Sequence, residues 1–211
     1  MSAVEATDLA SPPGVRDRLF EAGIETMARR GYHGTTTRDI TTRANVSPAA
    51  LYIHFPSKQH LLFEISRFGH AQAIEAVRRA RQQPGGPADR LMAVVSELAA
   101  LHAEQYKVAR VAQYELAALR EEHLAEIHEL RRALRSAVRA TIQEGVDEGC
   151  FCCDDVTGTT LAIISMCVDI ARWFDPAGSR TPQDLSATLA SIALRTVSAD
   201  LTAIGSRPVK R

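Results

Sequence analysis

Apolar residues recur along this chain mostly at intervals of three and four, the spacing that places side chains on one face of an α-helix. Phe20, Ile24 and Met27 show the pattern near the N-terminus. No segment keeps the apolar–polar alternation of a half-buried strand. The pattern therefore predicts an all-α protein of about nine helices. They are expected at residues 15–31, 37–44, 48–54, 58–81, 88–104, 107–118, 121–148, 154–174 and 182–204.

Two loops rich in proline and glycine divide the chain, QPGGPA at residues 83–88 and DPAGSRTP at 175–182. Both residue types interrupt helices. Gly31 also suits the left-handed backbone that commonly ends a helix. The expected organisation has four parts. They are an N-terminal tail at 1–14, a small helical domain at 15–60, a larger helical domain at 61–204 and a frayed C-terminal tail at 205–211.

Two short helices are expected in the small domain, at 37–44 and 48–54. Thr36 and Asp39 have the spacing of a capping box, in which each side chain accepts a hydrogen bond from the other residue's backbone N–H. Two such helices, joined by a tight turn and packed on a preceding helix, predict a helix-turn-helix at residues 36–55. The second helix of that motif enters the major groove of DNA.

The second short helix has a favourable start and a clear inward face. Ser47 is a good N-cap, and Pro48 is favourable at the first helical position because its missing N–H costs nothing there. Leu51 and Phe55 are expected to point inward. The preceding turn contains Asn45, which tolerates a left-handed conformation.

The window TTTRDITTRANVSPAALYIHFPSK, residues 35–58, resembles the DNA-binding segment of the TetR family of bacterial transcriptional regulators. The family usually has glycine where this chain has Asn45, a mild departure. The resemblance implies a helix-turn-helix head on a larger helical body that binds a small molecule and dimerises. The matching residues are Gly31, Thr36, Arg38, Asp39, Ile40, Ala44, Val46, Ser47, Leu51, Tyr52, His54, Phe55, Ser57, Lys58 and Leu61.

The resemblance also implies individual roles at double-stranded DNA. Phosphate contacts are implied for Thr36, Thr37, Tyr52, His54 and Lys58, and groove contacts for Ser47, Pro48, Ala49 and Ala50. Arg38 is implied as a base reader or a phosphate clamp. Structural alternatives stay open: Thr36 and Ser47 as caps only, and Arg38 paired with a neighbouring acid.

Charge changes this picture only locally. The 211 residues carry no net charge, but residues 15–68 hold eight Lys or Arg against five Asp or Glu, a net charge of +3. Such an excess is compatible with nucleic-acid binding. No apolar run reaches the roughly 20 residues needed to span a bilayer, and the acidic N-terminus lacks the apolar core of a secretory signal. A cytoplasmic protein without a membrane partner is expected.

The last helix carries an apolar stripe at coiled-coil spacing, which indicates a seam between copies of the chain. In the TetR family the last two helices form the dimer interface, so the resemblance implies a homodimer that reads a palindromic operator. A core within one chain is the alternative. The candidate seam residues are Leu189, Leu194, Val197, Leu201 and Ile204.

A shorter resemblance concerns the effector. The segment from Gly145 to Thr181, with Arg172-Trp173-Phe174, is similar to TetR regulators that sense fatty-acyl or steroid-derived coenzyme A thioesters. An ordinary helix face and interface packing of Trp173 are alternatives. A second possibility is a regulator of a multidrug efflux gene that senses aromatic or cationic compounds. The candidate pocket residues are Tyr106, Gln113, Tyr114, Arg172 and Trp173.

Enzymatic chemistry finds little support in the sequence. No nucleophile–base pair and no paired carboxylates at useful spacing occur, and the body has no glycine-rich phosphate loop. The CFCC run at 150–153 matches no zinc pattern, so its thiols and Cys167 are expected to be unpaired, with redox sensing or metal binding as alternatives. No metal or cofactor is expected. A scaffold that has lost DNA binding is disfavoured by the intact Tyr52, His54 and Lys58.

Overall fold

A computed structural model of the chain describes residues 14–198, and this part is helical throughout, with no β-strand. The predicted all-α architecture is confirmed, and every predicted helix is present. The elements are α1 (Val15–Arg30), α2 (Thr37–Arg43), α3 (Pro48–His54), α4 (Lys58–Arg81), α5 (Pro87–Glu104), α6 (Tyr106–Tyr114), η1 (Leu116–Ala118), α7 (Glu121–Asp147), α8 (Val156–Trp173) and α9 (Pro182–Ser198).

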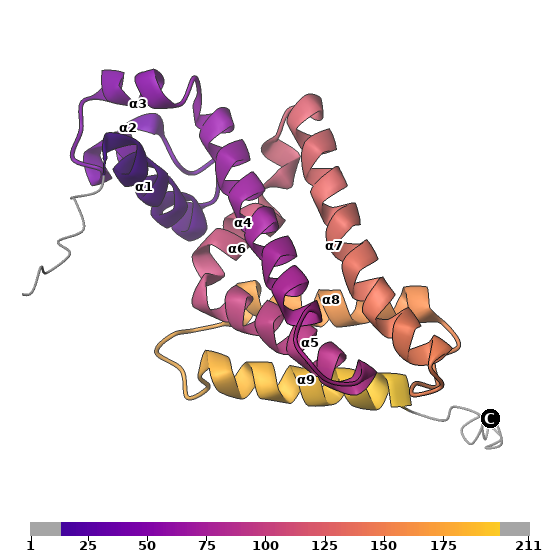
Figure 1. Cartoon of the computed structure of the whole chain (residues 1–211). Helices are drawn as coiled ribbons and strands as arrows, with labels where there is room; N and C mark the ends of the chain where they lie inside the picture. Colours follow the sequence, from indigo (N-terminus) through magenta and orange to yellow (C-terminus); the bar gives the residue numbers. More distant parts are fainter. Residues whose placement is uncertain (1–13, 199–211) are drawn as a thin grey trace, which may run out of the picture.

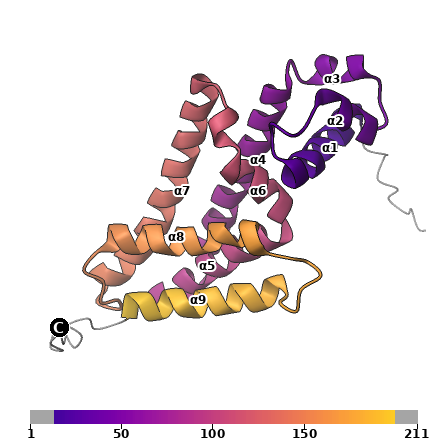
Figure 2. The same cartoon turned by 180° about the vertical axis from the view of Figure 1, so that it is seen from behind.

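Helices α1, α2 and α3 gather at one end of the molecule and are called the head; α4 to α9 are called the body (Figure 1). The long helix α4 runs from the head into the body, and α7 packs beside it. Helices α8 and α9 lie across the end that is opposite to α3, as the view from behind also shows (Figure 2). Helix α5 packs against α4, α7, α8 and α9 and so forms the centre of the body.

The head owes its shape to an apolar cluster that extends into the body. Leu51 and Phe55 are almost completely buried, as expected for the inward face of α3. The same cluster includes Leu61 of α4, Val111 of α6 and Ile127 of α7. The head therefore packs directly on α4, α6 and α7, so a shift of these helices changes its position.

One helix ends well before the expected residue, and the end of another lies outside the described residues. The helix expected at 107–118 ends at Tyr114, and the single 3-10 turn η1 follows it. This tighter turn brings Leu119 into the head cluster, where it is 9% exposed. The C-terminal helix is described to Ser198, so the seam candidates Leu201 and Ile204 lie outside the described residues.

The described part of α9 supplies the body core as well as its surface. Val197 is fully buried within the protomer, on α5 and its neighbours, and so offers no surface to a second chain in this conformation. Leu189 and Leu194 are partly buried at the edge of the same core. Among the described helices, none combines the length and apolar character required to cross a membrane.

Candidate functional site

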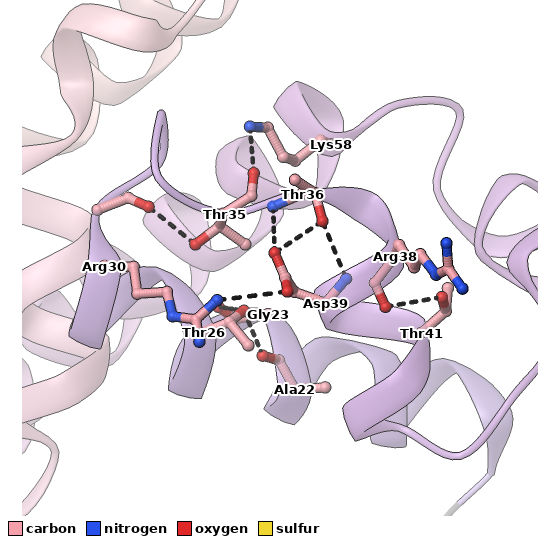
Figure 3. A network of polar contacts seen from close by, with 11 residues as sticks. Ala22, Gly23, Thr26, Arg30, Thr35, Thr36, Arg38, Asp39, Thr41 and Lys58 are labelled. Carbon is pink, nitrogen blue, oxygen red and sulfur yellow. Dashed lines mark hydrogen bonds and ion pairs between the residues drawn. The ribbon is translucent and has the colours of Figure 1, made fainter.

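The predicted capping box forms at the start of α2. The Thr36 backbone N–H donates to Asp39 Oδ2 at 2.8 Å, and the Asp39 N–H donates to Thr36 Oγ1 at 3.1 Å (Figure 3). The hydrogen bonds from Thr36, together with the nearby Arg30 guanidinium, lower the pKa of the Asp39 carboxyl. This box fixes the first turn of a helix too short to be stable alone.

The turn between α2 and α3 has the geometry that the sequence predicts. Asn45 has a φ of 53°, the left-handed conformation that glycine or asparagine adopts most readily. Ser47 occupies the N-cap position of α3, but its side chain makes no capping hydrogen bond. Instead, the Ala50 amide donates to the Ser47 carbonyl at 3.0 Å. The Ser47 hydroxyl is thus left for a partner outside the head.

Helix α3 presents its outer face to solvent. Ser47, Pro48 and Ala49 are exposed, and Ala50 is half-buried. Tyr52 is 56% exposed, whereas the neighbouring Leu51 is fully buried. The predicted recognition residues are therefore accessible on α3, which lies at the outer end of the head (Figure 1).

One residue of this surface was missed in the sequence. Ile53 is 78% exposed, although it is apolar and lies between the predicted contacts Tyr52 and His54. An exposed β-branched residue costs free energy in water, because its apolar area stays hydrated. The sequence does contain a signal for this exposure. Leu51 and Phe55 are expected to form the inward face of a two-turn helix, so Ile53 between them points outward.

The predicted contacts of α2 are also accessible. Thr36 and Arg38 are exposed and Thr37 is half-buried. The neighbouring acid Asp39 pairs with Arg30 at 3.3 Å, and within residues 14–198 Arg38 has no ion-pair partner. The alternative in which Arg38 only neutralises a neighbouring acid is therefore unsupported.

Lys58 is engaged within the protein itself. Its ammonium donates to the backbone carbonyls of Tyr32 at 2.8 Å and of Thr35 at 2.6 Å, and it lies 4.0 Å from the centre of the Tyr32 ring. Burial lowers the pKa of this lysine. The side chain fastens the connection between α1 and α2, directly before the capping box (Figure 3). Its predicted phosphate contact stays a prediction.

The predicted effector residues gather where α6 meets the end of α8. Tyr114 Oη donates to Asp169 Oδ1 at 3.4 Å, and Arg172 donates to both oxygens of Asp169 at 2.7 and 2.9 Å. Tyr106 packs edge-on against Phe174. Gln113 is half-buried on α6. Tyr114 is 47% and Trp173 48% exposed, so these side chains form a surface patch.

A buried polar group between α4, α5 and α7 was missed in the sequence. His70 of α4 and His102 of α5 are 2% and 4% exposed, and each has Nδ1 within 2.8 Å of the carbonyl four residues earlier. His70 Nε2 and the Ser66 hydroxyl have no hydrogen-bond partner in the part of the chain that is described. Burial lowers the pKa of His70 to about 4. Such unsatisfied atoms are costly, and a ligand can satisfy them.

The cysteines behave as the sequence predicts. All four are free thiols, with Cys150 and Cys152 exposed and Cys167 buried. Burial raises the pKa of Cys167 to about 12, so it acts as a small apolar residue. No cluster of metal-ligating side chains occurs among residues 14–198.

Comparison with known proteins identifies the family. Residues 19–65 match the family model of the bacterial regulatory proteins of the tetR family, and residues 84–197 match the tetracyclin repressor-like C-terminal domain. A crystal structure of a tetR-family regulatory protein from Rhodococcus RHA1 is similar, with 36% identity, a TM-score of 0.84 and coverage of 90% of this chain and 100% of that one.

Two further relatives have informative names. The transcriptional repressor KstR2 of Mycobacterium tuberculosis is 27% identical over 85% of this chain and 90% of its own length. The structure of AibR in complex with isovaleryl coenzyme A and operator DNA has the same fold, with 23% identity, a TM-score of 0.77 and coverage of 85% and 97% of the two chains. The helix-turn-helix, the helical body and these matches agree: the chain belongs to the TetR family of bacterial transcriptional regulators, which bind DNA and are not enzymes.

Proposed function

We propose that the protein is a cytoplasmic repressor, which binds a palindromic operator as a homodimer and leaves it when a coenzyme A thioester binds to the body. The observation that carries the DNA-binding part is the outer face of α3. Its predicted contacts are accessible, while Leu51 and Phe55 on the opposite face are anchored in the head. A helix held in this way enters a major groove without unfolding its own packing.

The proposed contacts fall into two classes. Thr36, Thr37, Tyr52, His54 and Lys58 position the head on phosphates, and Arg38 with Ser47 to Ala50 reads bases. Ile53 adds an apolar contact, which suits a thymine methyl group. The proposed limits of the DNA-binding domain are residues 15–60, with the effector-binding and dimerisation domain at 61–204.

The proposed dimer interface uses α8 and α9. Leu189 and Leu194 lie partly exposed on α9, and Trp173 is 48% exposed at the end of α8. An accessible indole of this size is typical of an interface residue. Because Val197 is buried in its own protomer, the interface is formed by the residues around it. Two heads on a two-fold body read half-sites about one helical turn or more apart.

The proposed effector class rests on the relatives and on the buried atoms of the body. AibR is described with isovaleryl coenzyme A and operator DNA together. In the part of this chain that the structure describes, Ser66 and His70 offer a buried hydroxyl and a buried imidazole nitrogen without hydrogen-bond partners. An apolar site with a few polar groups is the usual form of a small-molecule site. These atoms suit the carbonyl of a thioester.

A route from effector to DNA runs through α6. Lys107 of α6 binds Glu25 of α1 at 2.5 Å, and Glu25 also binds Arg43 of α2 at 3.4 Å. On the same helix, Arg110 donates to the Ala171 carbonyl of α8 at 3.0 Å. Helix α6 thus connects the head with a proposed dimerisation helix. An effector that favours one position of α6 shifts the population of head separations.

Selection of DNA from a random duplex library tests the proposal. The purified protein should enrich a palindrome, and its affinity should fall steeply as salt is raised, because phosphate contacts release counterions. A thermal-shift screen of acyl coenzyme A thioesters, fatty acids and planar aromatic compounds should then find a coenzyme A thioester that stabilises the protein and releases that palindrome. Failure to enrich any palindrome would contradict the DNA-binding role, and stabilisation by aromatic compounds alone would contradict the effector class.

A further inference from the structure

Helix α7 carries an unusual run of positive charge. Residues 130–143 contain four arginines and no acid, in a chain that has no net charge. The neighbouring helix α8 also contains no acid from Val156 to Val168. The two helices pack against each other. The surface between them is therefore cationic, without acidic side chains of either segment to neutralise it.

A groove of about 290 Å³ lies between these helices. Arg135 and Arg139 have no ion-pair partner in the described part of the chain, and Arg132 pairs only with Glu129 of its own helix. The exposed side chain of Leu161 adds an apolar wall. The residues that line the groove are Arg132, Arg135, Ser136, Arg139, Thr157, Thr160 and Leu161.

A second basic groove, on the other side of α7, is different. It measures about 550 Å³ and contains Arg78, Arg81 and Arg90. Each of these arginines has a carboxylate partner, as Arg78 binds Glu75 at 2.9 Å and both others bind Glu144. The pairs of Arg81 and Arg90 join α4 and α5 to α7, and the pair of Arg78 lies within α4. Of these two grooves, the one between α7 and α8 combines hydroxyl groups with arginines that have no acidic partner among the described residues, as a bound anion requires.

The positive charge of α7 also acts on the buried polar atoms of the body. Arg131, one turn before Arg135, lies near His70, and its charge acts together with burial to lower the pKa of that imidazole. Burial and the charge of Arg135 in turn lower the pKa of Arg131. Arg131 is therefore within electrostatic reach both of the buried His70 and of the exposed Arg135, which follows it by one helical turn.

DNA is not the anion that this position favours. Helix α8 and the adjoining end of α7 lie at the end of the molecule opposite α3 (Figures 1 and 2). A duplex in contact with the outer face of α3 is therefore far from the groove. A small anionic ligand that reaches from the interior to the surface fits the position better.

We propose that the groove between α7 and α8 binds the phosphate groups of the effector, with Arg135 and Arg139 as the main contacts. This inference rests on the proposed coenzyme A thioester, which joins an apolar acyl chain to a diphosphate and a ribose phosphate. Guanidinium groups bind phosphate oxygens in pairs of parallel hydrogen bonds. Ser136 and Thr157 supply further donors, and Leu161 contacts the adenine ring.

Calorimetric titration of the full-length protein tests the inference with two probes, lauroyl coenzyme A and the lauroyl thioester of pantetheine, which lacks all phosphates. The double variant Arg135→Gln/Arg139→Gln should raise the Kd for lauroyl coenzyme A about tenfold or more. It should leave the Kd for the pantetheine thioester and for operator DNA unchanged. Arg78→Gln, in the other basic groove, serves as the matched control and should bind both probes like wild type.

The outcomes separate the two proposals. Equal binding of lauroyl coenzyme A by wild type and the double variant would overturn the inference and leave the effector class intact. An equal loss of affinity for lauroyl coenzyme A in Arg78→Gln would overturn the inference as well. Positive charge anywhere on the body would then be enough to attract the phosphates. Wild-type protein that binds its operator but neither lauroyl probe would contradict the proposed effector class and remove the inference with it.

Discussion

The Lys107 ammonium lies 2.5 Å from the Glu25 carboxylate, and this ion pair joins α6 of the body to α1 of the head. Both side chains are about one-third exposed, at 38% and 31%. A pair of this exposure contributes about 1 kcal/mol or less to stability. The ion pair matters because of its place between helices: the same carboxylate also binds Arg43 of the helix-turn-helix, so it links α6 to α2.

Glu25→Gln should weaken the response to effector more than it weakens DNA binding. The substitution removes the charge that links α6 to both α1 and α2, so a shift of α6 moves the head less. Without effector, the Kd for the operator should stay within about twofold of wild type, whereas the effector-induced rise in Kd should shrink about fivefold, a typical allosteric coupling. Fluorescence anisotropy with labelled operator, with and without effector, measures both quantities.

Glu21→Gln is the matched control for this prediction. Glu21 is exposed on the same helix and makes no ion pair among the described residues. It should respond to effector like wild type. A full effector response in Glu25→Gln would show that coupling passes through the apolar contacts of α4 and α6 instead.

Lys58→Met separates the two roles of Lys58. The variant loses hydrogen bonds to two backbone carbonyls, and the free energy of unfolding should fall by roughly 1–3 kcal/mol. If the ammonium also contacts phosphate, affinity should fall about equally for all DNA sequences, and the slope of log K against log salt should decrease by about 1. Thermal denaturation and binding at several salt concentrations measure the two effects. Reduced stability with an unchanged salt slope would restrict Lys58 to holding the α1–α2 connection.

Lys58 also shows where prediction from the sequence ends. The capping box of Thr36 and Asp39, and the left-handed Asn45, depend on neighbours within a few residues, so the sequence predicts them correctly. The acceptors of Lys58 lie 26 and 23 residues earlier in the chain. Only the packed head brings them within reach.

The same distinction explains the differences in the body. The apolar spacing of α9 predicts that Val197 is buried. Burial within the protomer and burial in a dimer interface require the same spacing of apolar residues, so the sequence does not distinguish them. The unsatisfied atoms of Ser66 and His70 become visible only when α4, α5 and α7 are packed together. The ion pair of Glu25 with Lys107 joins residues 82 positions apart. Helix positions are thus predictable, whereas contacts between distant helices are not.

Arg38→Ala should relax DNA specificity at one position of each half-site. The guanidinium is exposed at the start of α2, and among the described residues it has no acidic partner, so it is free to bind a base edge. Loss of a bidentate contact to guanine costs about 1–3 kcal/mol for the preferred base and little for the others. Selection from a randomised half-site compares the variant with wild type.

Ile53→Ala provides the comparison for Arg38→Ala on α3. Ile53 is 78% exposed, so its truncation leaves the head packing intact. Preference should weaken at a thymine, because the apolar contact to the methyl group is lost. A uniform loss of affinity over all sequences in Arg38→Ala would assign that residue to phosphate contact.

His70 should make the protein less stable in mild acid. Burial lowers its pKa from 6.5 to about 4 in the folded protein, whereas in the unfolded chain it titrates normally. The unfolded state therefore takes up a proton first as pH falls, and stability decreases between about pH 6.5 and pH 4, by roughly 3 kcal/mol in total. The buried His102 contributes in the same direction, because its pKa is also lowered.

In His70→Leu, chemical denaturation at several pH values should show a smaller loss of stability between pH 6.5 and pH 4. His128→Gln, at an exposed position of α7, should keep the wild-type loss. An identical pH dependence in His70→Leu would mean that other groups dominate acid destabilisation, and that the imidazole is solvated by water in the folded body.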